Sequence, residues 1–102
     1  MYFETIRTKD ILKYIQEPNT LIVDLRESKE YKKGHIPSAV NIPYEVIDQY
    51  LNTFCDYQVI VLYCERGNLS LLAARDLSNQ GLQGVKSLYG GLTSYAGKLE
   101  KI

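Results

Sequence analysis

Residues 59–70 read VIVLYCERGNLS, an apolar run that ends at a cysteine and continues into a short loop containing a glycine. Short runs rich in β-branched residues predict strands buried on both faces. A helix is expected next, from Ser70 to Gln80, and Gly81 is a natural residue to follow its end. The apolar face of this helix comprises Leu72, Ala73 and Leu77. The pattern therefore places Cys64 between a buried strand and a helix.

Strand-like and helix-like patterns alternate along the rest of the chain. The run Leu21-Ile22-Val23 leads into Asp24-Leu25-Arg26, and weaker strand patterns cover residues 2–6, 39–42 and 85–88. Thr8 is a predicted N-cap, and Pro43 is placed in the first turn of a second helix. The expected apolar positions of these two helices, and of a third after Gly90-Gly91, are Ile11, Leu12 and Ile15; Val46, Ile47, Tyr50 and Leu51; and Leu92, Tyr95, Ala96 and Leu99.

This alternation predicts an α/β fold, with a mostly parallel sheet and helices on both faces. In such sheets ligands bind at the carboxyl ends of the strands. The segments Asp24–Arg26 and Cys64–Ser70 both follow strong strand patterns, so we expect them at the same edge of the sheet.

Length and composition limit the function classes. The 102 residues fit one domain, residues 1–102, and the 12 Lys and Arg residues balance the 12 Asp and Glu residues, so nothing favours a nucleic-acid or membrane partner. No apolar run approaches the ~20 residues that span a bilayer, and no secretory signal is visible at the N-terminus. With only two cysteines, Cys55 and Cys64, a reduced cytoplasmic setting is expected.

The loop after the strand offers a setting for cysteine chemistry. Amide N–H groups near a helix start are unpaired, and a short loop can aim several at one point, where a Cys64 thiolate would be stabilised. Gly67 permits unusual backbone angles, Asn68 tolerates left-handed geometry, and Ser70 can cap the helix or bind an anion. The alternative is that Cys64 is simply a small buried hydrophobic residue.

Several ordered blocks resemble the rhodanese (sulfurtransferase) family, in particular its single-domain members. The segment Leu21–Arg26 with Glu30-Tyr31 is similar to a first signature, and Gly34–Pro43, which reads GHIPSAVNIP, closely matches a second. The loop at Cys64 resembles the active-site loop of the family in its length and glycine position. Gly81 and the Gly90-Gly91 pair resemble the closing elements.

The resemblance implies a three-layer sandwich around a five-stranded, mostly parallel sheet. It also implies a sulfurtransferase that takes sulfane sulfur onto Cys64 as a persulfide and passes it to a thiol or cyanide-type acceptor. The donor would be a small molecule or a protein-bound persulfide, and no cofactor is implied. The loop residues expected to bind substrate and stabilise the persulfide are Glu65, Arg66, Gly67, Asn68, Leu69 and Ser70.

Two loop positions bear on the donor. Arg66 can attract an anionic donor through charge-assisted hydrogen bonds, or it can be an exposed arginine that only aids solubility. Many family members carry a basic residue where this chain has Leu69. We therefore predict weak use of thiosulfate, or a different donor such as a protein-bound persulfide.

Other polar residues are assigned supporting roles. Asp24 and Arg26 could be catalytic, but we expect them to organise loops through an ion pair, with Glu30 as a further candidate partner of Arg26. His35 could act as an acid or base, but its Gly-His-Ile-Pro context favours a turn packed against the core. Cys55 is expected to be a buried or semi-buried bystander, and no metal-ligand spacing is present.

Two other functions compete with sulfur transfer. One is a non-catalytic binding or regulatory module, which would not require the intact set Cys64, Gly67 and Ser70. The other is a cysteine-dependent phosphatase or arsenate-handling enzyme. That chemistry needs an arginine six residues after the nucleophile, where this chain has Ser70, and a longer loop.

Overall fold

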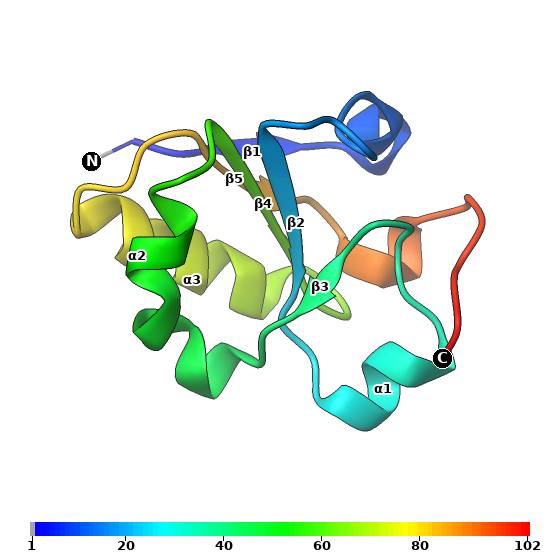
Figure 1. The fold of residues 1–102 in the computed structure, drawn as a ribbon. Coiled ribbons are helices and arrows are strands. Elements are labelled where there is room, and N and C mark those ends of the chain that lie inside the picture. The colour runs from blue at the N-terminus through cyan, green and yellow to red at the C-terminus, as the bar shows by residue number, and fades with distance from the viewer. Residues whose placement is uncertain (1) are drawn as a thin grey trace.

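In a computed structural model, which describes residues 2–102, five strands form one sheet (Figure 1). The strands are β1 (Glu4–Ile6), β2 (Thr20–Asp24), β3 (Val40–Asn41), β4 (Val59–Tyr63) and β5 (Val85–Leu88). Their order across the sheet is β1-β5-β4-β2-β3, and every pairing is parallel. The predicted α/β class and five-stranded parallel sheet are confirmed.

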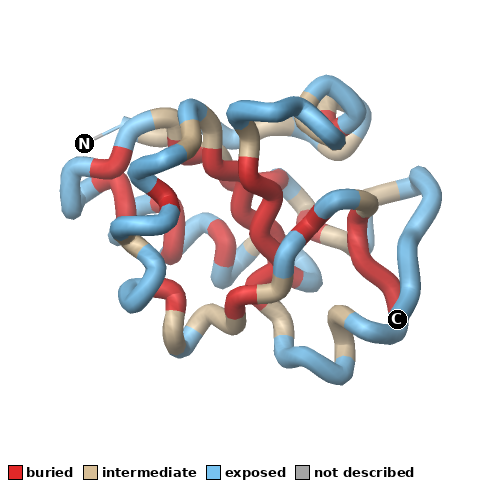
Figure 2. Tube along the Cα trace, viewed as in Figure 1, coloured by how far each residue is buried: buried red, intermediate tan, exposed pale blue. Residues whose placement is uncertain are grey.

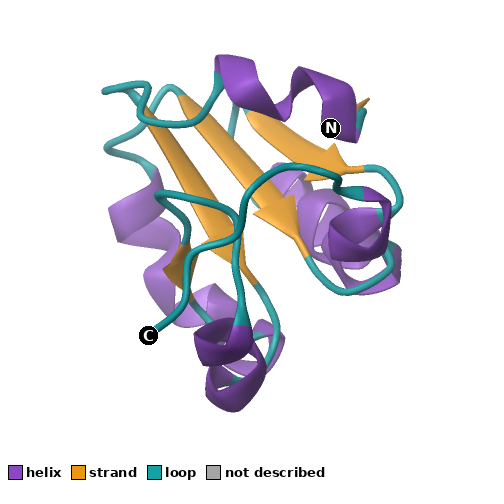
Figure 3. Ribbon diagram, turned by 90° about the vertical axis from the view of Figure 1, so that its right-hand side faces the viewer, coloured by secondary structure: helices purple, strands orange, loops and turns teal. Residues whose placement is uncertain are grey.

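Helical segments cover both faces of the sheet (Figure 3). The 3-10 segment η2 (Tyr44–Tyr50) and the helices α2 (Leu51–Phe54) and α3 (Asn68–Asn79) pack on one face. The 3-10 segments η1 (Thr8–Lys13) and η3 (Gly91–Ser94) contribute to the opposite face. The short helix α1 (Ser28–Lys33) leads into the segment that carries His35.

The central strand β4 contributes to both cores through its alternating side chains. In β4, Ile60 and Leu62 belong to the core under α3, whereas Val61 and Tyr63 belong to the core on the other face. Figure 2 shows this buried centre as a continuous band through the sheet. Because the alternation has a period of two, Cys64 continues the row of Ile60 and Leu62 and faces α3.

The expected long helix α3 forms, starting two residues before Ser70. Its end has the Schellman geometry: the N–H groups of Gly81 and Leu82 donate to the carbonyls of Ser78 and Leu77, over 3.0 and 3.1 Å. Gly81 follows the helix as expected. Ala73 and Leu77 are buried as expected, but Leu72 is 39% exposed, and Ala74 completes the buried face of α3.

Three helix predictions need correction, namely those at Thr8, after Pro43 and after Gly90-Gly91. The segment at Thr8 is a 3-10 helix in which Thr8 makes no capping bond, and its hydroxyl donates to the carbonyl of Ser94 instead. Leu12 is 74% exposed, because one tight 3-10 stretch buries Ile11 alone. After Pro43, most of the segment is 3-10 as well, and only residues 51–54 are α-helical.

The segment after Gly90-Gly91 forms only the short η3, and a loop follows in which Ala96 and Leu99 are exposed. The loop ends in an isolated antiparallel bridge between His35 and Glu100, which share two backbone hydrogen bonds of 2.9 and 2.8 Å. Helix α1 was not among the predicted helices. Within residues 2–102, no helix has both the length and the apolar character needed to cross a membrane.

Candidate active site

Cys64 directly follows β4 at the carboxyl edge of the sheet, and only 3% of its surface is exposed. Two backbone N–H groups donate to its Sγ atom, that of Gly67 over 3.1 Å and that of Ser70 over 3.4 Å. Both donors lie at the start of α3, where the helix dipole adds positive potential. The arrangement stabilises negative charge on the sulfur, as expected for a thiolate site.

Gly67 is the residue before α3 and adopts a left-handed conformation with φ +100°. A Cβ atom at this position would lie 3.1 Å from the backbone nitrogen of Gly90. Glycine is therefore needed both for its backbone angle and for the close approach of the turn after β5. The left-handed conformation of Gly67 directs its own N–H toward the Cys64 sulfur.

The turn after β5 supports the cysteine loop from the other side. The N–H groups of Leu92 and Thr93 donate to the carbonyls of Cys64 and Glu65, over 2.9 and 3.0 Å. A Cβ atom on Gly91 would lie 2.6 Å from the Cys64 oxygen and 2.7 Å from the Glu65 oxygen. The two chain segments thus pack backbone to backbone, which fixes the loop without any side-chain contact at these points.

Ser70 lies inside the first turn of α3 and is completely buried. Its hydroxyl donates to the Gly67 carbonyl over 3.1 Å and lies 2.9 Å from the Ser87 hydroxyl. Ser70 is therefore not the N-cap that the sequence suggested, since Gly67 holds that position. Its backbone, rather than its hydroxyl, contacts Cys64.

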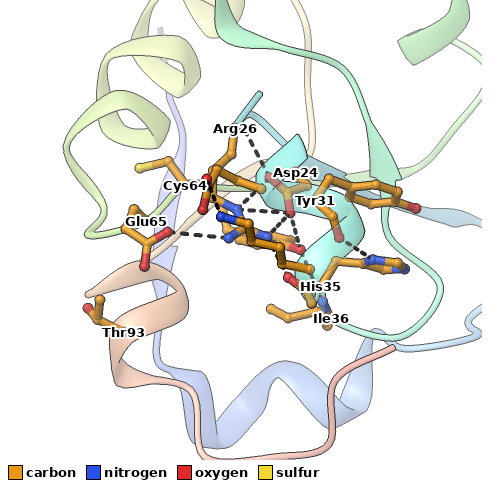
Figure 4. Close-up of polar contacts among 12 residues, drawn as sticks. Asp24, Arg26, Tyr31, His35, Ile36, Cys64, Glu65 and Thr93 are labelled. Carbon is orange, nitrogen blue, oxygen red and sulfur yellow. Dashed lines mark hydrogen bonds and ion pairs between the residues drawn. The ribbon is translucent and has the colours of Figure 1, made fainter. Parts of the chain in front are cut away.

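Asp24 and Arg26 meet beside the loop, at the edge of the sheet where they were expected (Figure 4). Arg26 Nη2 lies 2.8 Å from Asp24 Oδ2, and Nη1 lies 3.3 Å from Glu65 Oε1. The expected pairing of Arg26 with Glu30 is wrong: Glu30 instead lies 3.3 Å from Lys33, one turn along α1. Arg26 thus connects the end of β2 to the residue that follows Cys64.

Tyr63 was not singled out from the sequence, yet it completes this network. Its hydroxyl donates to Asp24 Oδ2 over 2.7 Å and accepts the N–H of Ile36 over 3.0 Å. Burial, together with the negative charge of Asp24, raises the pKa of Tyr63, so the phenol remains a protonated donor. The signal in the sequence was a tyrosine at the end of an otherwise aliphatic strand.

His35 lies on the opposite side of this network from Cys64 (Figure 4). Its ring stacks on Tyr31 with a centroid separation of 3.8 Å, and its Nδ1 lies 2.8 Å from the Tyr31 carbonyl. It is buried. These contacts are those of a histidine that organises the turn after α1.

The remaining loop side chains point to the surface. Arg66 and Asn68 are exposed, and Leu69 is 40% exposed. Cys55 is also exposed, contrary to the expected burial, and it is the C-cap residue that follows the short α2. Among the residues that the structure describes, no group of three His, Cys, Asp or Glu side chains could hold a metal ion.

Comparison with known proteins agrees with this geometry. The Rhodanese-like domain family matches residues 8–98. The chain belongs to this family. A rhodanese-like domain protein from Staphylococcus aureus superposes with a TM-score of 0.84 and 26% identity, covering 97% of this chain and 98% of that one. This confirms the resemblance that the sequence blocks indicated.

Two curated relatives of this rhodanese-like domain are longer proteins. YrkF of Bacillus subtilis is 35% identical over 78% of this chain, and a tRNA sulfurtransferase of Desulfurococcus amylolyticus is 37% identical over 81%. The matched region spans 43% and 16% of their respective lengths. This chain is therefore similar to only part of each relative.

Proposed function

We propose that this rhodanese-like domain transfers sulfane sulfur through a persulfide on Cys64. The observation that carries the proposal is the pair of N–H groups, from Gly67 and Ser70, that donate to the Cys64 sulfur. These N–H groups stabilise the Cys64 thiolate, which then attacks the donor. A neighbouring general base is not needed to form the thiolate. Membership of a family that includes a named tRNA sulfurtransferase supports the same chemistry.

The first step loads the enzyme. The Cys64 thiolate attacks the outer sulfur of the donor, a new S–S bond forms to Cys64, and the S–S bond of the donor breaks. The electron pair of that bond leaves with sulfite when the donor is thiosulfate, or with a thiolate when the donor is a persulfide. We expect the N–H groups of the loop to hold the negative charge of the bound persulfide.

The second step returns the enzyme to its starting state. A nucleophilic acceptor, such as a thiol or cyanide, attacks the outer sulfur of the Cys64 persulfide. The S–S bond breaks, and its electron pair returns to the Cys64 sulfur. This ping-pong cycle needs no oxidant, reductant or cofactor.

The charges around the loop favour a persulfide over thiosulfate as the donor. Glu65 places a carboxylate next to Cys64 and is 53% exposed, and Leu69 supplies no cation where many family members have one. Arg66 is the one cation within residues 64–70. The dianionic thiosulfate gains little from a loop with one positive and one negative side chain, whereas the reacting persulfide group of a thiol donor carries at most one negative charge.

We further propose that residues 1–102 act as one rhodanese-like domain in the cytoplasm, with a sulfane sulfur donor and a thiol-type acceptor as partners. Nucleic acid is not proposed as a partner of this domain, because its 12 basic residues are balanced by 12 acidic ones. Membrane binding is not proposed for the same reason.

The test is sulfur transfer to cyanide, followed as thiocyanate, with thiosulfate and with glutathione persulfide as separate donors. We expect turnover with both, faster with the persulfide at equal concentration. Cys64→Ser should abolish transfer, and Cys55→Ser, which changes the exposed cysteine, should leave it unchanged. Absence of transfer with either donor, in folded protein with a reduced Cys64, would favour a non-catalytic binding module instead.

A further inference from the structure

A buried pair of hydroxyl groups lies behind the cysteine loop. Ser87, on β5, is 2% exposed, and its hydroxyl lies 2.9 Å from that of the fully buried Ser70. Within residues 2–102, this is the only hydrogen-bond partner of the Ser87 side chain. The direction of the bond follows from proton counting. Ser70 has one hydroxyl proton, and it is directed at the Gly67 carbonyl, so Ser87 donates to Ser70.

The pair connects β5 to both groups that contact the sulfur. Ser70 and Gly67 each donate a backbone N–H to Cys64, and the Ser70 hydroxyl joins these two residues to each other through the Gly67 carbonyl. Ser87 holds that hydroxyl from the sheet. Because β5 is hydrogen-bonded to β4 and to β1, its position is fixed by the sheet rather than by the loop.

A serine at this position also needs an explanation from packing. Ser87 lies between the buried residues Val85 and Leu88, on the face of the sheet that packs against α3. An aliphatic residue would bury more apolar surface there, and a buried hydroxyl is tolerated only when it is hydrogen-bonded. Within residues 2–102, the side chain of Ser87 bonds only to Ser70, one of the two residues whose N–H groups donate to the Cys64 sulfur.

We propose that Ser87 is a positioning residue for Cys64: its hydrogen bond to Ser70 keeps the Gly67 and Ser70 N–H groups aimed at the sulfur. The inference deepens the proposed function, because it concerns the same thiol. Without this bond, the Ser70 hydroxyl is held only by its bond to the Gly67 carbonyl, the first turn of α3 loses its connection to β5, and the N–H groups stabilise the thiolate less well.

The test compares Ser87→Thr with Ser87→Val. The two side chains have the same shape, so any steric cost of the branched side chain is common to both, and only the hydroxyl differs. Ser87→Ala is less suitable, since Ser87 also lines a hollow of about 470 Å³ beside the loop, from which water could replace the lost hydroxyl. Ser78→Ala is the control, because Ser78 is a buried α3 serine whose hydroxyl, among residues 2–102, bonds only within its own helix.

The first readout is the rate at which iodoacetamide alkylates Cys64, measured as a function of pH in a Cys55→Ser background. We expect Ser87→Val to lower the rate at neutral pH about fivefold, as loss of one hydrogen bond predicts, and to move the midpoint of the profile to higher pH. Ser87→Thr and Ser78→Ala should retain the parent profile. The charged groups on and beside the loop, Asp24, Arg26, Glu65 and Arg66, are the same in every variant.

Equal profiles for the Thr and Val variants, with both folded, would overturn the inference. So would a Ser78→Ala profile shifted as far as that of Ser87→Val, because the effect would then be one of general stability. Alkylation requires only the thiol. Failure of the parent to accept sulfur would therefore contradict the proposed function, while this comparison would still decide the role of Ser87.

Discussion

Tyr63 joins three separate chain segments at the scale of a single side chain. Its hydroxyl donates to Asp24 and accepts the N–H of Ile36, so one buried group satisfies partners from β2 and from the turn after α1. Asp24 is itself fully buried and also binds Arg26, which reaches Glu65 on the cysteine loop. Loss of the phenol would leave both buried partners short of a hydrogen bond.

We expect Tyr63→Phe to lower the free energy of unfolding by about 1–3 kcal/mol, measured by urea denaturation near pH 7. Tyr57→Phe is the matched control, since Tyr57 packs on the core but its hydroxyl makes no hydrogen bond among residues 2–102. Equal losses in the two variants would show that the Tyr63 network contributes no net stability.

The same variant predicts a pH dependence. The pKa of Tyr63 is raised in the folded state above its ordinary value of 10.0, so the folded protein keeps this proton where the unfolded chain loses it. The stability due to this proton is therefore complete below about pH 10 and is lost as the pH rises further. The stability difference between the parent and Tyr63→Phe should shrink above pH 10. A difference that grows with pH in urea titrations would have the wrong sign.

Leu69 is exposed in the first turn of α3, on the loop that we propose to bind the donor. We expect Leu69→Arg to increase the rate of persulfide formation from thiosulfate roughly three- to tenfold at low salt, with the gain lost as salt is added. Leu72→Arg is the control, because both leucines are exposed to nearly the same extent, 40% and 39%, on the same helix. No gain in the Leu69 variant, or an equal gain in both, would contradict the proposed effect of this position on donor choice.

At the scale of elements, the cysteine loop depends on the turn that follows β5. Gly91 adopts φ +62°, and a Cβ there would collide with the backbone oxygens of Cys64 and Glu65. Gly81 has a similar left-handed φ of +99° but open space around it. An alanine at either position would have a strained backbone angle, but only an alanine at Gly91 would also collide with neighbouring atoms.

We expect Gly81→Ala to cost about 1 kcal/mol and Gly91→Ala about 2–4 kcal/mol, as measured by urea denaturation. Only Gly91→Ala should also slow alkylation of Cys64, because it displaces the carbonyls at the loop. Equal stability of the two alanine variants would show that the close packing of Gly91 against the cysteine loop does not constrain the conformation of that loop.

The elements also show what the sequence could and could not predict. The strands at 20–24 and 59–63 were predictable, because buried parallel strands contain continuous apolar runs. The strand at 85–88, which reads VKSL, has only a weak strand pattern. Leu12, Ala96 and Leu99 were misassigned, since apolar spacing alone does not distinguish an α-helix from a 3-10 turn or a loop. The cysteine loop was located from its glycine and its place after a strand. Ser87 and Tyr63 were missed, because their partners come from elements distant in sequence.

At the scale of the whole molecule, the order β1-β5-β4-β2-β3 puts β4 at the centre, between β5 and β2, and puts β1 and β3 at the edges. The site occupies the carboxyl end of this centre, where Cys64 and Arg26 follow two adjacent strands. A rigid base of this kind suits a loop that must keep two N–H groups on one sulfur atom.

We expect hydrogen exchange on the intact protein to follow this order. The amides of β4 and β2 should exchange only through global unfolding, whereas those of β1 and β3 should exchange faster through local opening. The amides of Leu92 and Thr93, which bond to the loop carbonyls, should be protected more than those of the exposed segment after them. Amide exchange in β1 and β3 as slow as in β4 and β2 would contradict this order of local stability.

The most direct test of sulfur transfer is the intact mass of the protein after incubation with a sulfane sulfur donor, either thiosulfate or glutathione persulfide. We predict a gain of one sulfur atom in the parent and in Cys55→Ser, reversed by cyanide, and no gain in Cys64→Ser. No gain in a parent with a reduced Cys64, or a gain that persists in Cys64→Ser, would contradict a persulfide on Cys64.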